Sequence, residues 1–231
     1  MTKVKWLAFG IAFLVVSAGV MALFFENLGN QANPSKIIRV ACVGDSITEG
    51  SGYPAKLQQM LGSNYEVGNF GVSGSAVLLT SDKPYMNQAA FLKAKEFQPN
   101  IVVVMLGTND AEKTTYQHIE SFSDTYKKLV TQLQALRSMP QVWLVEPPPI
   151  LDNQLNLSDT NLVNGVIPRI VQVADEMHLP TIDIYRALIS YNEFFGDGVH
   201  PSSEGADLIA MEINNAITSN DSPLSCLHLT A

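Results

Sequence analysis

Short apolar runs alternate along the chain with longer stretches in which apolar residues recur every three or four positions. The most pronounced run, IVVVML at residues 101–106, is typical of a strand buried on both faces of a parallel sheet. The runs that predict strands are residues 37–43, 65–70, 101–106, 141–145 and 181–184. The stretches that predict helices are residues 54–61, 86–97, 114–138, 161–177 and 202–217.

This alternation of strands and helices predicts the α/β class, as a three-layer α/β/α sandwich around a parallel five-stranded sheet. Five strands suggest the flavodoxin-like order 2-1-3-4-5, in which the first strand lies between the second and the third. The loops after these three strands then meet at one edge of the sheet. They carry Ser46, Gly74 and Asn109.

The N-terminal region has a different pattern, because residues 6–25 contain no charged side chain. As a helix this stretch is long enough to cross the roughly 30 Å of a bilayer's hydrocarbon. Lys3 and Lys5 precede it, which predicts a cytoplasmic N-terminus and an extracytoplasmic domain. We expect an uncleaved anchor; a cleaved signal, giving a secreted protein, and a buried core helix are the alternatives. The resulting segments are 1–25 (membrane anchor or signal), 26–35 (linker), 36–218 (catalytic domain) and 219–231 (C-terminal tail).

Charge and cysteine content narrow the class of protein. The formal net charge of -8 and the lack of a basic run argue against binding to nucleic acid. Cys42, in the first predicted strand, and Cys226, in the tail, are predicted to be unpaired thiols. No metal-ligand spacing is present, so we expect neither a metal nor a cofactor. The pattern does not predict the oligomeric state.

The candidate chemistry is acyl transfer by a serine. Ser46 follows the first strand in a Gly-Asp-Ser turn, although that tripeptide alone is ordinary turn chemistry. Asp197 and His200 are three residues apart in a loop that precedes the last helix, a spacing that lets the carboxylate reach Nδ1 of the imidazole. His200 is then the expected base and Asp197 its orienting group. The expected oxyanion donors are the N–H groups of Ser46 and Gly74 and the side-chain amide of Asn109.

Other readings of these residues remain open. The aspartate–histidine pair could cap the last helix, and Asn109 with Asp110 could cap the element that follows them. Gly71 could face the substrate in place of Gly74. Asp45 and Asp110 have no partner at acid–base spacing, so we expect them to shape the loops.

Taken together, four blocks of sequence resemble the SGNH hydrolases, the GDSL-type esterase and lipase superfamily. The resemblance extends from Ile37 to Ile217. Its blocks are GDSIT from Gly44, NFGVSG from Asn69, GTND from Gly107 and DGVHP from Asp197. The resemblance implies the same three-layer fold, Gly74 at the oxyanion position, and ester hydrolysis without a metal at an open, flexible site. Within the superfamily, the amino-acid sequence of these blocks is similar to that of carbohydrate O-acetylesterases, including those that act on acetylated sialic acid and plant polysaccharides.

The expected function is therefore that of a serine esterase acting on short acyl esters, acetyl above all, of carbohydrate. A lysophospholipase or thioesterase that acts on longer acyl chains is the alternative enzyme. A non-catalytic, membrane-anchored binding module with the same fold is the alternative from another class. The expected partners are a small-molecule or glycan ester and, through the N-terminal segment, the membrane.

Overall fold

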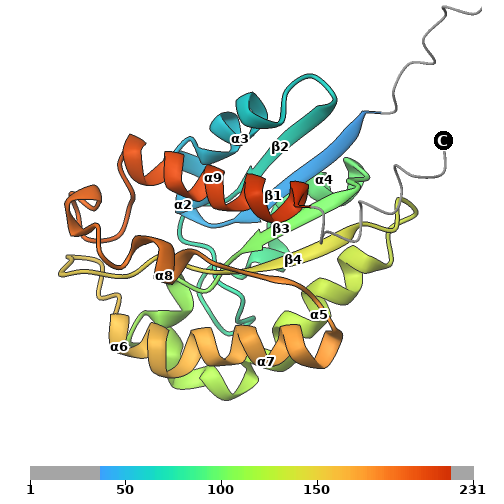
Figure 1. Cartoon of the computed structure of the whole chain (residues 1–231). Helices are drawn as coiled ribbons and strands as arrows, with labels where there is room; N and C mark the ends of the chain where they lie inside the picture. Colours follow the sequence, from blue (N-terminus) through green and yellow to red (C-terminus); the bar gives the residue numbers. More distant parts are fainter. Residues whose placement is uncertain (1–36, 220–231) are drawn as a thin grey trace, which may run out of the picture. The chain divides into compact units, whose positions relative to one another are not determined.

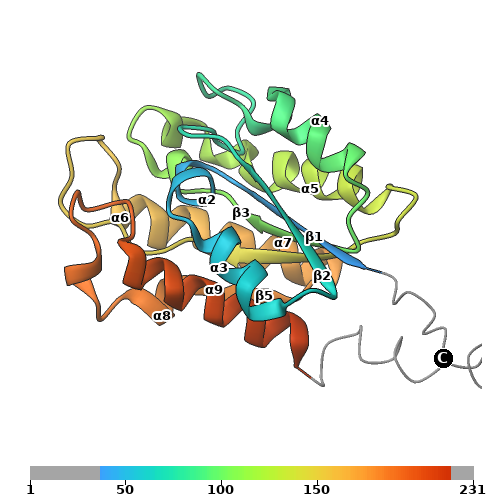
Figure 2. The same cartoon turned by 90° about the horizontal axis from the view of Figure 1, so that it is seen from above.

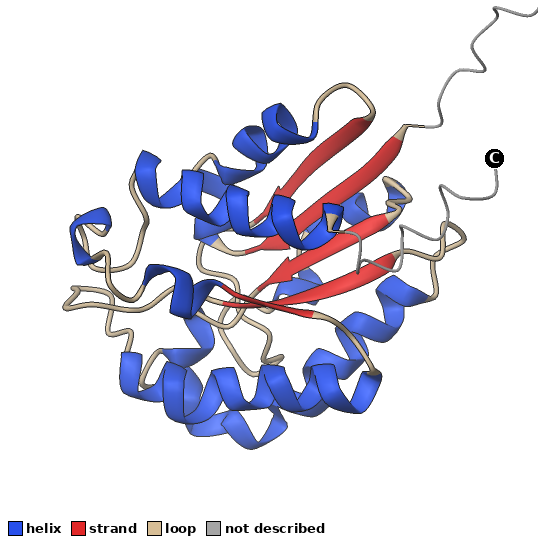
Figure 3. Ribbon diagram, in the orientation of Figure 1, coloured by secondary structure: helices blue, strands red, loops and turns tan. Residues whose placement is uncertain are grey.

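A computed structural model describes residues 37–219. At their centre is a five-stranded parallel sheet with the order β2-β1-β3-β4-β5, as predicted (Figures 1 and 3). The strands are β1 (Ile38–Gly44), β2 (Tyr65–Gly71), β3 (Ile101–Met105), β4 (Gln141–Glu146) and β5 (Thr181–Asp183). All five run in the same direction, so their carboxyl ends lie at one edge of the sheet.

Helices cover both faces of this sheet and complete the predicted three-layer sandwich (Figure 2). The layer on one face consists of α4 (Ala89–Glu96), α5 (Phe122–Gln134) and α7 (Ile167–Met177). The layer on the other face consists of α3 (Tyr53–Leu61), α8 (Ile184–Leu188) and α9 (Ser203–Thr218). Side chains alternate along β1 between the two cores: Val43 packs with α4 and α5, and Val40 with α3 and α9. Both faces of the strand are therefore buried.

Three details differ from the sequence prediction. Residues 114–138 are not one helix, because a 3₁₀ segment (Thr115–Ser121) with non-helical backbone angles at His118 precedes α5. A three-residue spacing of apolar side chains suits both kinds of helix, so the pattern did not distinguish them. β5 ends at Asp183, whose carboxylate caps α8 by accepting from the N–H of Arg186 at 2.8 Å. The Gly-Asp-Ser turn opens directly into a short helix, α2 (Ser46–Gly50).

Two glycines allow α2 to pack against the ends of β1 and β2. A Cβ on Gly44 would lie 1.9 Å from Oγ1 of Thr48, and a Cβ on Gly71 would lie 2.2 Å from the backbone nitrogen of Glu49. Any side chain at either position would push α2 away from the sheet. The two glycines thus place the first residue of α2, Ser46, at the carboxyl edge.

Several predictions concern residues at or beyond the ends of this range. The membrane segment at 1–25, the linker at 26–35, Cys226 and nearly all of the predicted tail lie outside the described residues. Within residues 37–219 no helix is both long and apolar enough to span a bilayer. Cys42 is a free, fully buried thiol in β1, and burial raises its pKa to about 12. It is therefore a small core residue, as predicted.

Candidate active site

Ser46 occupies the N-terminus of α2, immediately after β1. The preceding residue, Asp45, is buried, and its carboxylate caps the helix by accepting from the N–H of Ile47 at 3.0 Å. Burial raises the pKa of Asp45 to about 6, although the Ile47 hydrogen bond acts in the opposite direction. Asp45 thus shapes the turn, as predicted, while the Ser46 side chain stays partly accessible.

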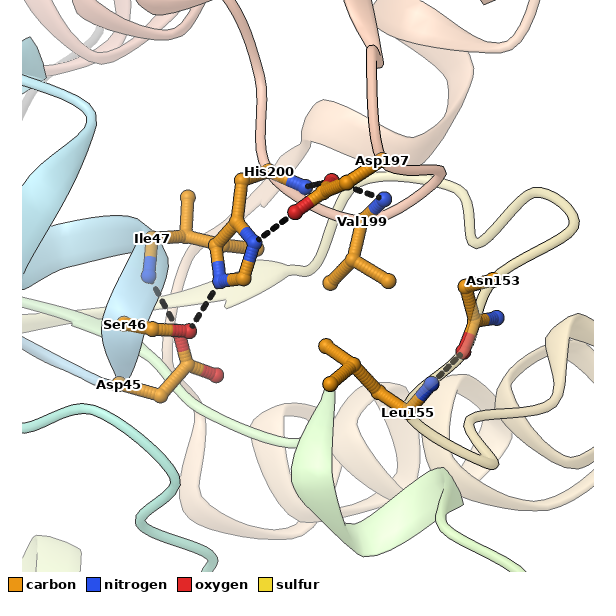
Figure 4. A network of polar contacts seen from close by, with 8 residues as sticks. All are labelled: Asp45, Ser46, Ile47, Asn153, Leu155, Asp197, Val199 and His200. Carbon is orange, nitrogen blue, oxygen red and sulfur yellow. Dashed lines mark hydrogen bonds and ion pairs between the residues drawn. The ribbon is translucent and has the colours of Figure 1, made fainter.

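The loop before α9 brings an imidazole to this serine (Figure 4). Nε2 of His200 lies 2.9 Å from Oγ of Ser46, across 154 positions of sequence. Nδ1 of His200 lies 2.6 Å from Oδ2 of Asp197. The other carboxylate oxygen, Oδ1, accepts from the backbone N–H groups of Val199 at 2.9 Å and His200 at 2.8 Å. The three side chains therefore form one connected hydrogen-bond chain.

The charge on Asp197 determines the direction of the hydrogen bonds along this chain. Burial acts to raise the pKa of Asp197, but the bonds from the backbone and imidazole of His200 and from Val199 outweigh it and lower the pKa to about 2. An ionised carboxylate only accepts, so Nδ1 of His200 donates to it. In the neutral imidazole Nε2 is then the acceptor, and the hydroxyl of Ser46 donates to Nε2. This is the tautomer that a general base for Ser46 requires.

The loop that carries Asp197 is held in place by a neighbouring loop. Gly198 adopts a φ of +82°, and its carbonyl accepts from the N–H of Leu151 at 2.7 Å. A Cβ on Gly198 would lie 2.0 Å from the carbonyl oxygen of Asp152, so the close contact requires glycine. The cap of α9 is Ser202, whose hydroxyl accepts from Gly205. Capping of the last helix is therefore not the role of the aspartate–histidine pair.

The three expected oxyanion donors line the same cavity as the serine and histidine. Among the described residues, the N–H groups of Ser46 and Gly74 have no hydrogen-bond acceptor, so both are available to a substrate. Gly74 has a φ of +74°, which favours glycine. Nδ2 of Asn109 donates to the carbonyl of Ser75 at 2.9 Å, which orients the amide and leaves its second N–H unused.

The alternative glycine has a different environment. The N–H of Gly71 donates to the side chain of Asn69 at 2.9 Å, and the residue packs against the backbone of α2. Gly74, by contrast, lines the cavity. The N-cap position of the 3₁₀ turn at Asn109–Ala111 is Thr108, and the side chain of Asn109 donates to Ser75 outside that turn. Gly74 and Asn109 are thus the better-placed donors.

Asp110, next to Asn109, anchors the loop that follows Gly74. It is completely buried, and its two carboxylate oxygens accept from the N–H groups of Val77 and Leu78, each at 2.9 Å. Burial raises the pKa of Asp110 to about 7, and the nearby carboxylate of Asp45 adds to this effect. Asp110 therefore has the loop-shaping role predicted for it.

The cavity has a volume of about 500 Å³ and walls of mixed character. Ala76, Leu155, Leu157 and Val199 contribute apolar surface. The polar and charged lining residues, apart from those named above, are Ser73, Ser81, Asp82, Lys83, Glu112, Thr114 and Thr115. Within residues 37–219 no group of three or more His, Cys, Asp or Glu side chains is arranged to hold a metal ion.

Residues 42–208 match the model of the GDSL-like Lipase/Acylhydrolase family. The chain belongs to this family. The resemblance stated from the sequence blocks is confirmed, since this GDSL-like match covers most of the described domain.

Individual relatives agree with the family assignment. An acetylxylan esterase from Xylanibacter ruminicola is 33% identical over 223 residues, which cover 83% of this chain and 46% of the relative. A GDSL esterase/lipase from Oryza sativa is 24% identical over 143 residues, 53% of this chain and 55% of the relative. This GDSL-like chain thus spans about half the length of these curated relatives.

Solved structures share the fold of this GDSL-like domain. A carbohydrate acetylesterase from Sinorhizobium meliloti superposes with a TM-score of 0.65 at 18% sequence identity. The superposition covers 78% of this chain and 98% of the acetylesterase chain. An acetyl xylan esterase superposes with a TM-score of 0.63 at 21% sequence identity. The superposition covers 78% of this chain and the whole of the acetyl xylan esterase chain. At such identities the similarity confirms the three-layer fold alone.

Sequence reasoning missed the groups that hold the site together. The carbonyl of Ser75, which orients Asn109, carries no signal in the sequence because every residue has a carbonyl. Leu155 and Leu157 reach the cavity from a loop predicted only as a connection after residues 147–149.

Proposed function

We propose that this GDSL-like domain is a serine esterase that removes short acyl groups, acetyl above all, from carbohydrate esters. The observation that carries the proposal is the 2.9 Å contact between Oγ of Ser46 and Nε2 of His200, with Asp197 on the other ring nitrogen. Ser46 is the nucleophile, His200 the general base and Asp197 the group that holds the required tautomer.

The reaction has two steps. The hydroxyl proton of Ser46 passes to Nε2 of His200 as Oγ bonds to the ester carbonyl carbon. The tetrahedral intermediate then collapses, its bond to the alcohol oxygen breaks, and the imidazolium returns the proton to that oxygen. A water molecule next gives a proton to His200 and attacks the acyl-enzyme. Release of the acid breaks the bond to Ser46, which regains its proton.

In both steps, negative charge develops on the former carbonyl oxygen. The N–H groups of Ser46 and Gly74 and the amide of Asn109 are the proposed donors to it. Because they are held in place before the reaction, they stabilise that charge without a further reorganisation cost.

Asn109→Ala should lower kcat by about 10²-fold with little change in KM, the usual result of losing one oxyanion donor. Asn109→Asp should be at least as impaired, since an ionised carboxylate cannot donate. Steady-state kinetics with p-nitrophenyl acetate measure both effects. Asn87→Ala removes an exposed amide in the 3₁₀ turn that precedes α4 (Tyr85–Asn87), outside this cavity, and should leave kcat unchanged. A normal kcat in Asn109→Ala would exclude this donor.

The cavity supports a polar alcohol as leaving group. Its volume of about 500 Å³ far exceeds that of an acetyl group, so most of the space is available to the alcohol portion of the ester. The hydroxyl and charged side chains in its wall suit the hydroxyl groups of a sugar. The similarity to an acetylxylan esterase supports the same substrate class. An extracytoplasmic location, expected from residues 1–25, suits a polysaccharide substrate.

Activity against a series of p-nitrophenyl esters should be highest for acetate and fall as the acyl chain lengthens. The values of kcat/KM for acetate, butyrate, octanoate and palmitate measure this dependence, and release of acetate from acetylated xylan tests the carbohydrate portion. A maximum at eight or more carbons would support a lysophospholipase or thioesterase in place of an acetylesterase. Failure of a fluorophosphonate probe to label Ser46 would support a binding module.

A further inference from the structure

The peptide group between Ser73 and Gly74 carries one of the proposed oxyanion donors, and its other end is held by a charged side chain. Nζ of Lys83 donates to the carbonyl oxygen of Ser73 at 2.8 Å. No peptide bond in the described residues is cis. In a trans peptide the C=O and N–H groups point in opposite directions within one plane. The contact from Lys83 to the Ser73 oxygen therefore also restricts the direction of the Gly74 N–H.

A second charge holds the preceding peptide. Oε2 of Glu49 accepts from the N–H of Ser73 at 2.8 Å and also from the Ser73 hydroxyl. These two hydrogen bonds lower the pKa of Glu49, and the charge of Lys83 contributes in the same direction. Glu49 lies in α2, three residues after Ser46, so it relates the loop to the nucleophile. The two side chains together restrain both backbone torsions of Ser73.

Packing contributes little to the position of this loop. Ser73 and Gly74 are exposed, and a Cβ built on Gly74 would meet no atom within 4 Å. On the far side, Ser75 donates its N–H to the carbonyl of Val72 at 3.1 Å. The direction of the Gly74 N–H thus depends on polar contacts. A cation on the carbonyl also polarises the peptide and makes its N–H a stronger donor.

We propose that Lys83 and Glu49 are positioning residues for the oxyanion donor of Gly74. They act through the backbone of Ser73, and neither needs to contact the substrate for this role. The inference rests on the esterase function proposed above. Lys83 also lines the cavity, so direct binding of substrate by its ammonium group is the competing explanation, and the experiment separates the two.

Lys83→Met in the full-length chain should lower kcat for p-nitrophenyl acetate by about fivefold to tenfold. KM should stay within about twofold of the parent. This result is expected for a charge-assisted hydrogen bond that is used in the transition state. Lys83→Arg keeps the charge and should recover most of the rate. Glu49→Ala should lower kcat similarly. The double variant should lose less than the product of the single losses, because both side chains hold one loop. The rate of fluorophosphonate labelling of Ser46 should fall in parallel with kcat.

Lys93→Met is the matched control, since it removes an exposed ammonium group on α4, outside the cavity. It should keep the parental kcat, and the melting temperature should show that each variant is folded. A raised KM with unchanged kcat in Lys83→Met would overturn the proposal in favour of substrate binding. Equal losses in Lys83→Met and Lys83→Arg would also overturn it. If the Ser46→Ala variant has no turnover and the Lys83→Met variant has the parental kcat, the positioning role alone is refuted. If the Ser46→Ala variant still turns over substrate, the esterase mechanism itself is refuted.

Discussion

Ser46→Ala should lower kcat for p-nitrophenyl acetate by about 10⁴-fold or more, because removal of the nucleophile from a serine hydrolase leaves only the oxyanion donors and substrate binding. The hydroxyl donates to Nε2 of His200 at 2.9 Å and makes no other hydrogen bond within the described residues. Its loss therefore should not disturb the fold. Initial rates in a long assay, corrected for spontaneous hydrolysis, measure the residual activity.

The control for this variant is Ser63→Ala, which removes an exposed hydroxyl between α3 and β2. It should keep the parental kcat and the parental melting temperature. Labelling by a fluorophosphonate probe should be lost in Ser46→Ala and retained in Ser63→Ala. Substantial turnover in a folded Ser46→Ala variant would rule out the acyl-enzyme mechanism.

Asp197→Asn should have the next largest effect, a loss of about 10²-fold to 10⁴-fold in kcat, because it favours the wrong tautomer of the base. Oδ1 of Asp197 accepts two backbone N–H groups, so the amide oxygen of an asparagine should take that place and its NH₂ group should face Nδ1 of His200. Nδ1 then becomes the acceptor and Nε2 carries the proton. In that state Nε2 cannot accept the proton of Ser46.

We give the expected loss of kcat as a range because the side chain of Asp197 is 55% exposed. Water can therefore partly take over its hydrogen bond to His200. Asp175→Asn, an isosteric change at an exposed position of α7, is the control and should retain the parental rate. An Asp197→Asn variant with an unchanged pH–rate profile and kcat would show that the carboxylate is not needed for tautomer selection.

The same carboxylate determines how the acid limb of the pH–rate profile should be interpreted. Its pKa of about 2 means that Asp197 stays ionised in any assay above about pH 3. A loss of activity in acid above that value should therefore not arise from protonation of Asp197. Asp197 itself adds native-state stability that is present above its ordinary pKa and is lost only as the pH falls toward 2.

Much of the fold could be predicted from the sequence because the patterns that indicate strands and helices are local. The run IVVVML and the helical spacing of apolar residues reflect burial on both faces of β3 and on one face of each long helix. The division between the 3₁₀ segment at Thr115–Ser121 and α5 was not readable, since both helices place every third residue on one side. The cap at Asp183 was missed because Ile182 and Ile184, on either side of it, continue the alternating pattern of a strand.

By itself, the sequence determined the layer order of this protein, the family to which it belongs, and the side chains that could act as nucleophile, base, orienting group and oxyanion donors. Those features depend on residue type and short spacing. Only the tertiary structure decided that the imidazole of residue 200 reaches the hydroxyl of residue 46, that the buried carboxylate of Asp110 accepts from the loop after Gly74, and that opposite charges hold Ser73. The physical reason is that such contacts join distant parts of the chain through backbone groups common to all residues. Their geometry follows from the packing of whole loops.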